Sequence, residues 1–275
     1  MNYTDLIRYI LPPIIIDGIR YIKIIYLGDY GIIGDYSSWS DAQKVSVGYE
    51  SDIILQKTKG AIMKVNEDIS IYERDSVLMD KPEYIYQTLT GLMRAAAQDG
   101  GELNVLDFGG SLGSTYYHNR KFLQGLFVRW NIIEQPGYVK VGKELFQDDI
   151  LKFYNTIEEC MAQTEPNVIL LGSTLQYLEN PYEILNELMD QNINHIIIDR
   201  TPFWDGPTDK ICIENVPPEI YPGSYPMWVF SGQKFLDFII GNKNKYQFVV
   251  DYQISERMKS QTPIIWKGMI LEKSD

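Results

Sequence analysis

Short apolar segments alternate with amphipathic segments between Leu103 and Asp199, and this alternation limits the chain to few architectures. The apolar segments carry few polar side chains, as expected for strands that are covered on both faces of a sheet. We expect strands at 103–108, 130–134, 150–154, 168–172 and 195–199, and helices at 116–124, 137–145, 156–163 and 181–191. Strands that alternate with helices of this length form a parallel sheet, so the sequence predicts an α/β fold.

The alternation ends after residue 200. The segments 210–214 and 227–230 predict two strands of a hairpin inserted near 205–230. Ser231 is a suitable N-cap for a helix at 231–240. Long apolar segments at 246–254 and 264–272 then predict two final strands.

The first hundred residues differ in pattern from this core. At 275 residues the chain is longer than one usual domain. Turn signals such as Gly34-Asp35-Tyr36 precede helix-like segments at about 40–65 and 84–97, and the second of these ends at Gly100-Gly101. We therefore expect a mainly helical cap or lid at 1–100 and a core domain at 101–275.

Charge and cysteine usage bear on the class of partner. The formal net charge is -12 and the basic residues are scattered, so a nucleic acid is not an expected partner. Cys160 and Cys212 have no metal-ligand or disulfide spacing, which predicts no metal site and indicates the cytoplasm. Charged residues interrupt the apolar stretch 14–33, so it predicts no transmembrane segment or signal peptide, and a peripheral membrane contact is the alternative.

The segment between the first predicted core strand and the next helix reads Asp107-Phe108-Gly109-Gly110-Ser111-Leu112-Gly113. Small residues let the backbone approach a ligand, and the turn leaves the first N–H groups of the helix free. The segment resembles the Asp-x-Gly-x-Gly-x-Gly loop of class I S-adenosylmethionine-dependent methyltransferases, with Ser111 in place of the middle glycine. A dinucleotide-binding Gly-x-Gly-x-x-Gly loop, the alternative, would need glycine at both Ser111 and Ser114.

An acidic residue follows the second core strand. Glu134 lies 21 residues beyond Gly113, where this class of fold places a carboxylate on the ribose hydroxyls of the cofactor, and Gln135 follows it. A helix cap at Pro136 is the alternative role for Glu134. The segment Gly172-Ser173-Thr174-Leu175-Gln176-Tyr177-Leu178 with Asn180-Pro181 resembles a signature of many small-molecule methyltransferases, which implies that Ser173 and Gln176 contact the cofactor.

Three further short segments also carry a resemblance. Residues 34–39, 72–76 and 198–203, taken with the core, resemble one family of bacterial methyltransferases associated with surface-polysaccharide biosynthesis. The resemblance implies a Rossmann-like sheet with an antiparallel final strand and S-adenosylmethionine as cofactor. It also implies a glycan, sugar-linked or small phosphorylated acceptor, methylated on oxygen or, as the nearest variant, on nitrogen. Arg74 is expected on the methionine carboxylate if the cap folds over the cofactor, with a salt bridge between cap and core as the alternative.

Asp199 and Arg200 are the first candidates for contact with the acceptor, because they follow the fifth strand at the edge where open α/β sheets bind ligands. An ion pair with the neighbours of Asp199 is the alternative for Arg200. His118 and Tyr177 are further catalytic candidates, with an ordinary partly exposed histidine and a packing tyrosine as alternatives. We also expect Gly113→Val to abolish cofactor binding while leaving the fold intact, whereas the sequence predicts no oligomeric state. A non-catalytic nucleotide-binding module and a nicotinamide-dependent oxidoreductase are the competing functions.

Overall fold

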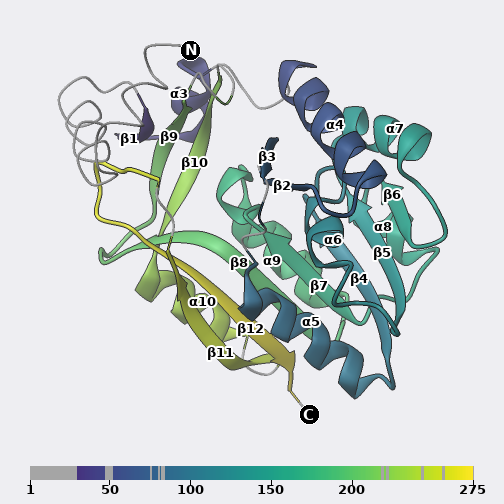
Figure 1. Cartoon of the computed structure of the whole chain (residues 1–275). Helices are drawn as coiled ribbons and strands as arrows, with labels where there is room; N and C mark the ends of the chain where they lie inside the picture. The colour runs from purple at the N-terminus through teal and green to yellow at the C-terminus, as the bar shows by residue number, and fades with distance from the viewer. Residues whose placement is uncertain are drawn as a thin grey trace.

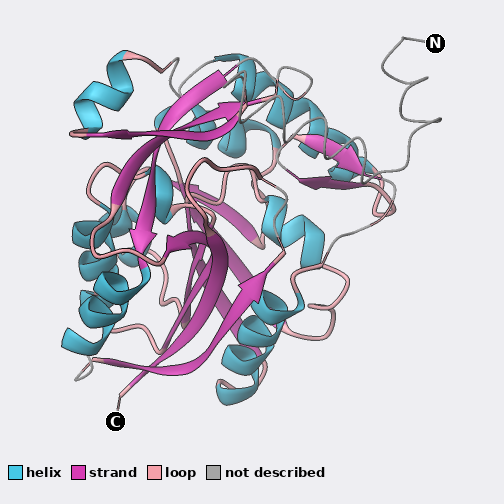
Figure 2. Ribbon diagram, turned by 90° about the vertical axis from the view of Figure 1, so that its left-hand side faces the viewer, coloured by secondary structure: helices cyan, strands magenta, loops and turns pink. Residues whose placement is uncertain are grey.

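The computed structural model describes residues 30–46, 52–74, 76–79, 81, 84–217, 220, 223–242, 245–255 and 258–274. In this part of the chain, helices lie on both sides of one large sheet (Figures 1 and 2). The sheet contains β1 (Gly31–Tyr36), β4 (Glu102–Phe108), β5 (Phe127–Ile133), β6 (Leu151–Tyr154), β7 (Val168–Gly172), β8 (His195–Trp204), β9 (Lys210–Val216), β10 (Gly223–Ser231), β11 (Tyr246–Ile254) and β12 (Ile265–Lys273).

Parallel strands form the centre of the sheet, in the order β6-β5-β4-β7-β8. Strand β12 pairs antiparallel with β8, and β11 pairs antiparallel with β12. The predicted fold class, a mostly parallel Rossmann-like sheet with an antiparallel final strand, is therefore confirmed. A parallel sheet brings the carboxyl ends of its strands to one edge, and in this fold class that edge binds ligands.

The helices cover both faces of the sheet. They are α3 (Trp39–Lys44), α4 (Asp52–Glu67), α5 (Tyr86–Gln98), α6 (Ser114–Asn119), α7 (Pro136–Leu145), α8 (Ile157–Met161), α9 (Pro181–Asp190) and α10 (Gly232–Gly241). On one face, Leu92 of α5 packs in the cluster that contains Ile197 of β8. On the other, Leu188 of α9 packs in the cluster that contains Ile198. Neighbouring residues of β8 face opposite layers and both are fully buried, which explains the apolar run at 196–198.

Most of the predicted helices and strands are confirmed, and several differ in extent. The helix expected at about 40–65 is two helices, α3 and α4, and residues 47–51 between them lie outside the described part. Helix α6 ends at Asn119 rather than near residue 124, and β8 continues five residues past Asp199.

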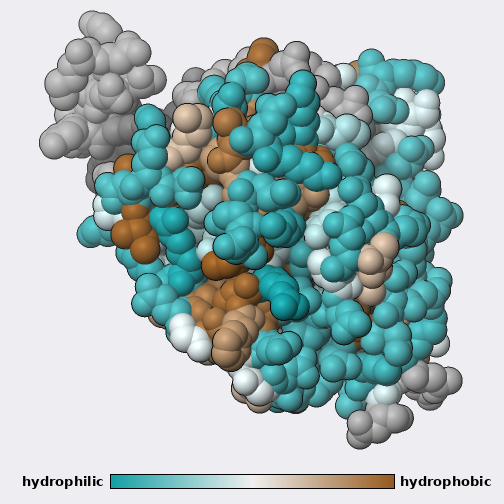
Figure 3. All heavy atoms as spheres, turned by 90° about the vertical axis from the view of Figure 1, so that its right-hand side faces the viewer, coloured by the Kyte–Doolittle hydropathy of each residue, from teal (hydrophilic) through white to brown (hydrophobic). Residues whose placement is uncertain are grey.

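The surface over α7 and β6 (Figure 3) is mainly hydrophilic, as expected for helices that bury one side only.

The predicted hairpin is confirmed as the antiparallel pair β9–β10, and the structure joins it to the main sheet. Phe230 and Ser231 at the end of β10 pair in parallel with Phe203 and Trp204, the last two residues of β8. Strand β1 pairs with the free edge of β9. We call β1, β9 and β10 the upper wall, because they stand over the carboxyl edge of the central strands (Figure 1).

The interpretation of Gly34-Asp35-Tyr36 as a turn is wrong. These residues lie within β1, where the register with β9 shifts between Ile33 and Tyr36. Gly34 has φ of +83° at this irregularity. A glycine inside a strand marks a bulge as readily as a turn, and the long-range pairing with β9 determines which of the two forms.

A second irregularity interrupts β8 at Arg200. The pairing with β12 shifts register between Lys267 and Met269, opposite this residue, and Arg200 has φ of +50°. Such a left-handed conformation costs a non-glycine residue about 1–2 kcal/mol. Ser111 and Ser173, with φ of +55° and +61°, lie in the loops that follow β4 and β7. Backbone strain of this kind clusters at functional sites, and here it occurs at the ligand-binding edge of the sheet.

In the part of the chain that the structure describes, no helix has both the length and the apolar character needed to cross a membrane. Most of the apolar stretch 14–33 lies outside the described residues.

Candidate active site

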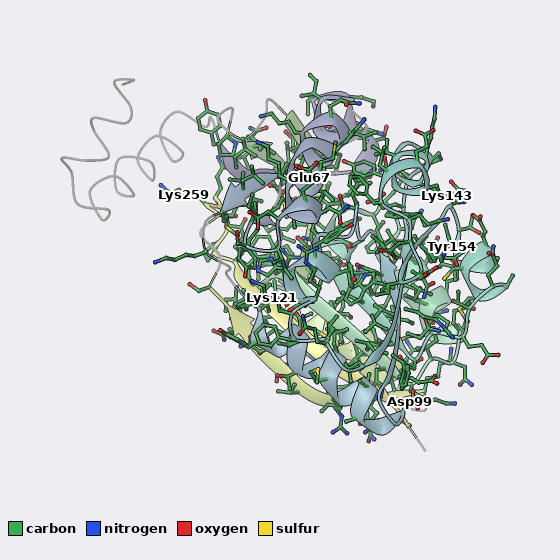
Figure 4. All side chains as sticks on the ribbon, turned by 45° about the vertical axis from the view of Figure 1, so that its right-hand side comes forward. Glu67, Asp99, Lys121, Lys143, Tyr154 and Lys259 are labelled. Atoms are coloured by element: carbon green, nitrogen blue, oxygen red, sulfur yellow. The ribbon has the colours of Figure 1, made fainter. Side chains whose placement is uncertain are left out.

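One cavity of about 660 Å³ lies between the carboxyl edge of the central strands and the segments above it. Its floor comes from the ends of β4, β5, β7 and β8, and its walls come from the upper wall, from α4 and from the turn between β2 (Tyr72–Arg74) and β3 (Val77–Met79). In Figure 4, Asp99 marks the opposite edge of the sheet, far from Glu67 at the end of α4. The strained residues Ser173 and Arg200 line the cavity.

Phe108 and Gly109 are the residues of the Asp107–Gly113 loop that line the cavity. The φ of Gly109 is +74°, and a Cβ at this position would lie 2.4 Å from Cγ2 of Thr174, so only glycine fits. Its N–H donates to the carbonyl of Ile133, 2.8 Å away, which fixes the loop to the end of β5. The backbone therefore approaches the cavity closely at this point.

Asp107 lies beneath the loop rather than on the cavity wall. It is buried, and its Oδ2 accepts a hydrogen bond from Nε1 of Trp130 at 2.8 Å. A Cβ on Gly110 would lie 2.5 Å from the Asp107 carboxyl group, so the second glycine makes room for this carboxylate. Burial raises the pKa of Asp107 to about 7, against the lowering effects of Trp130 and Arg200. These contacts support the loop from below.

Gly113 is the N-cap of α6 and has φ of +97°, and the expectation that Gly113→Val leaves the fold intact is wrong. A Cβ here would meet Leu151 at 3.2 Å and Tyr117 at 3.4 Å. Both of these side chains are buried in the core. Added bulk would therefore disturb the fold before it reached a ligand.

Glu134 follows β5 and lines the cavity together with Gln135. Its carboxylate accepts the backbone N–H of Gln135 at 2.6 Å and a backbone hydrogen bond from Ser111. Burial raises the pKa of Glu134 to about 7, and the charge of Asp107 raises it further, whereas the two backbone hydrogen bonds lower it. Gln135 is the N-cap of α7, so the carboxylate lies at the helix start and also on the cavity, which fits both roles considered for it.

The loop after β7 connects the ends of two neighbouring strands. Ser173 lines the cavity, and its Oγ accepts a hydrogen bond from Nε2 of Gln176 at 2.9 Å. The same amide donates to the carbonyl of Arg200 at 3.2 Å. Gln176 is fully buried and lies behind the wall, so it positions Ser173 and Arg200.

Asp199 and Arg200 both line the cavity and pair with each other. Nε of Arg200 lies 3.3 Å from Oδ2 of Asp199, and Tyr252 donates a hydrogen bond of 3.0 Å to the other carboxylate oxygen. A Cβ on Gly172 would lie 3.4 Å from an outer nitrogen of Arg200. The guanidinium group therefore lies across the end of β7, and it forms an ion pair with Asp199 itself.

His118 lines the cavity from α6 and packs in an aromatic cluster with Tyr72 and Tyr84. Its ring centroid lies 5.7 Å from that of Tyr72 and 5.3 Å from that of Tyr84. Lys121 donates a 2.6 Å hydrogen bond to the Tyr72 hydroxyl and lowers the pKa of Tyr72. Arg74 ends strand β2, but its side chain, like Asp75, lies outside the described residues.

Two groups of cavity residues were not identified from the sequence. Asn155, Thr156, Ile157 and Glu158 follow β6 at the carboxyl edge, and the topology rule that singled out Glu134 would have found them. Glu73 and Ser76 lie in the segment 72–76, to which the sequence assigned no cavity role beyond Arg74, and the other residues from α4 and the upper wall carry no motif: Ile54, Thr58, Glu214 and Tyr225. Glu214 is buried, and its Oε2 accepts a 2.6 Å hydrogen bond from the Tyr177 hydroxyl. Tyr177 therefore turns toward the upper wall rather than toward the Asp107–Gly113 loop.

No protein-family model and no curated protein matches this chain. Among solved structures it is similar to the N-terminal domain of EvdMO1 with S-adenosylhomocysteine bound, at 10% identity over 80% of this chain and 97% of that one, TM-score 0.45. It is also similar to the 1,6-didemethyltoxoflavin-N1-methyltransferase of Burkholderia thailandensis, at 10% identity over 89% and 94% of the two chains, TM-score 0.41. A third similar structure is the N-methyltransferase NodS of Bradyrhizobium japonicum, at 11% identity over 78% and 98%, TM-score 0.43.

No group of three or more His, Cys, Asp or Glu side chains within the described segments is arranged to hold a metal ion. The function proposed below depends on the residues of the cavity.

Proposed function

We propose that the protein is an S-adenosylmethionine-dependent methyltransferase that methylates an oxygen of a glycan, a sugar-linked compound or a small phosphorylated metabolite. One observation carries this proposal: Gly109 and the Glu134 carboxylate lie at the ends of adjacent strands and line the same cavity. In open α/β sheets this arrangement binds a nucleoside, with the backbone close to the ligand and the acid on the ribose hydroxyls. We place the reaction in the cytoplasm, because both cysteines are free and buried.

The residues present fit S-adenosylmethionine. Gly109 brings bare backbone to the cavity wall, and Glu134 offers a carboxylate to two hydroxyl groups. Asn155 and Thr156, which follow β6, add polar groups next to the ribose position. Ser173 would meet the methionine portion, and Arg74 is assigned to its carboxylate.

The cofactor, when bound, supplies an activated methyl group on a sulfonium sulfur. The chain's own residues then hold the two reactants in line and exclude water. Asp199, Arg200, His118 and Tyr177 are assigned to the acceptor side of the cavity, beyond the ends of β7 and β8. A nucleic acid is not a proposed partner, because acidic side chains outnumber basic ones in the described cavity lining.

Calorimetry with S-adenosylhomocysteine, S-adenosylmethionine and NAD(H) tests the proposal. We expect the two sulfur compounds to bind and NAD(H) not to bind. Glu134→Ala should weaken S-adenosylhomocysteine binding by about 1–3 kcal/mol, through loss of charged hydrogen bonds. Glu102→Ala is the matched control, because Glu102 is an exposed acid at the opposite end of β4. Preferred binding of NAD(H) would indicate an oxidoreductase, and cofactor binding without any methyl transfer would indicate a non-catalytic module.

A further inference from the structure

Glu214 is a buried carboxylate on the wall of the cavity opposite the cofactor loop. Side chains alternate along β9, so Ile211 and Ile213 pack toward α3, whereas Cys212, Glu214 and Val216 face the other side. Glu214 is 5% exposed and lines the cavity. A strand position in this apolar setting favours an aliphatic residue, so the carboxylate requires an explanation.

The surroundings hold this carboxylate in place. The Tyr177 hydroxyl donates to Oε2 at 2.6 Å, and Tyr225, the cross-strand partner of Glu214, stacks edge-on against Tyr177 with ring centroids 5.2 Å apart. Ile54 of α4 packs in the same cluster as Tyr225 and Val216. A carboxylate offers about four lone-pair sites, so it can accept the Tyr177 hydrogen bond and also a ligand O–H.

The charge of the cavity indicates which acceptors it admits. Its described lining includes the acids Glu73, Glu134, Glu158, Glu187, Asp199 and Glu214. Arg200 is the only lysine or arginine among the described lining residues, and it already pairs with Asp199. A phosphorylated or carboxylated acceptor would be repelled here, whereas a neutral one would not.

Two buried polar atoms of the lining indicate the kind of neutral group. Within the described residues, Oδ1 of Asn119 and Nε1 of Trp266 have no hydrogen-bond partner, and these residues are 6% and 5% exposed. The Asn119 oxygen is an acceptor and the Trp266 nitrogen is a donor. Buried polar groups are normally paired, and hydroxyl groups can pair with both because they donate as well as accept.

We propose that Glu214 is the general base of the reaction and that the acceptor is a neutral, hydroxyl-rich compound such as a glycoside. The proposal rests on the methyltransferase function proposed above. The acceptor O–H bond breaks and its proton passes to the Glu214 carboxylate. The oxygen forms the new bond to the methyl carbon, whose bond to sulfur breaks with both electrons remaining on sulfur. Tyr177 is a positioning residue that holds the carboxylate toward the acceptor.

The experiment uses the full chain, S-adenosylmethionine with a tritiated methyl group, and methyl hexopyranosides of the gluco, galacto and manno series with their 6-phosphates. We expect transfer to a neutral glycoside with kcat/KM at least about tenfold above that for its 6-phosphate. Glu214→Gln should lower kcat by about 10²–10⁴-fold, the usual contribution of a general base, and Glu102→Gln should have no effect. Calorimetry should give unchanged S-adenosylhomocysteine affinity in Glu214→Gln.

A second variant separates chemistry from folding. Glu214→Asp keeps the charge on a shorter side chain, so it should retain part of the activity that is lost in Glu214→Gln. The two variants should have the same thermal unfolding midpoint. Wild-type transfer rates in Glu214→Gln would overturn the assignment of the base. A preference for the 6-phosphates would overturn the acceptor class, as would absence of transfer to any neutral glycoside by protein that binds S-adenosylhomocysteine. Absence of S-adenosylhomocysteine binding would instead refute the proposed function itself.

Discussion

Acidification should weaken cofactor binding through Glu134. The pKa of this carboxyl group is about 7 in the protein without ligand. Ribose hydroxyls donate to the ionised form, so binding favours the charged state, and the affinity is complete above the pKa and lost below it. With this pKa, about 9% of the sites are protonated at about pH 8 and about 91% at about pH 6, so affinity should fall about tenfold, or about 1.4 kcal/mol.

Calorimetric titration of S-adenosylhomocysteine across this pH range measures the effect directly. Glu134→Gln cannot ionise, so its affinity should be lower than that of the wild type at about pH 8 and nearly independent of pH. Asp107 also has a pKa near 7, but it lies beneath the loop and remains present in the variant. The same pH slope in Glu134→Gln would therefore assign the effect to Asp107 and refute the reasoning, as would a flat wild-type profile.

Three further outcomes are expected. Gly113→Val should lower the free energy of unfolding by roughly 2–4 kcal/mol in urea titrations, because it combines a strained φ with a core clash; normal stability with lost cofactor affinity would contradict this. The free energy of unfolding of Asp107→Asn, relative to that of the wild type, should increase by roughly 2–4 kcal/mol when the pH is raised from about 4 to about 8. The raised pKa means that the wild type is fully stable below the unfolded-state value and loses stability as pH rises to about 7, so equal denaturation curves at both pH values would refute it. Gly109→Ala should lose more stability and S-adenosylhomocysteine affinity than Gly125→Ala, which has a similar positive φ but open space around its Cβ; equal losses would show that the contact with Thr174 is unimportant.

The residues found from the sequence are those that a local pattern or the topology fixes. Gly109 and Glu134 follow apolar strands, and a parallel sheet brings such positions to one edge whatever the rest of the chain does. Asp199 and Arg200 were placed on the cavity for the same reason. Their mutual ion pair was not predicted, because it depends on the bulge that turns Arg200 out of the regular strand.

The upper wall could not be assembled from local patterns. Glu214 reaches the cavity because β9 pairs with β1 and β10, and β10 in turn pairs with the end of β8. These contacts join segments that are far apart in the sequence, and the alternation along β9 does not reveal which face meets the cavity. Gly113 shows the reverse case, since its motif position indicated a ligand contact and its actual neighbours are core side chains.

The bulge at Arg200 has a mechanical consequence. Strand β8 extends from the central sheet to the upper wall, so any rocking of the wall over the cavity must flex this strand. The strand is weakest where its ladder with β12 is interrupted, at Arg200. Opening or closing of the acceptor side would therefore rotate the Arg200 side chain relative to Asp199, so that the hinge and a residue assigned to the acceptor would be the same residue.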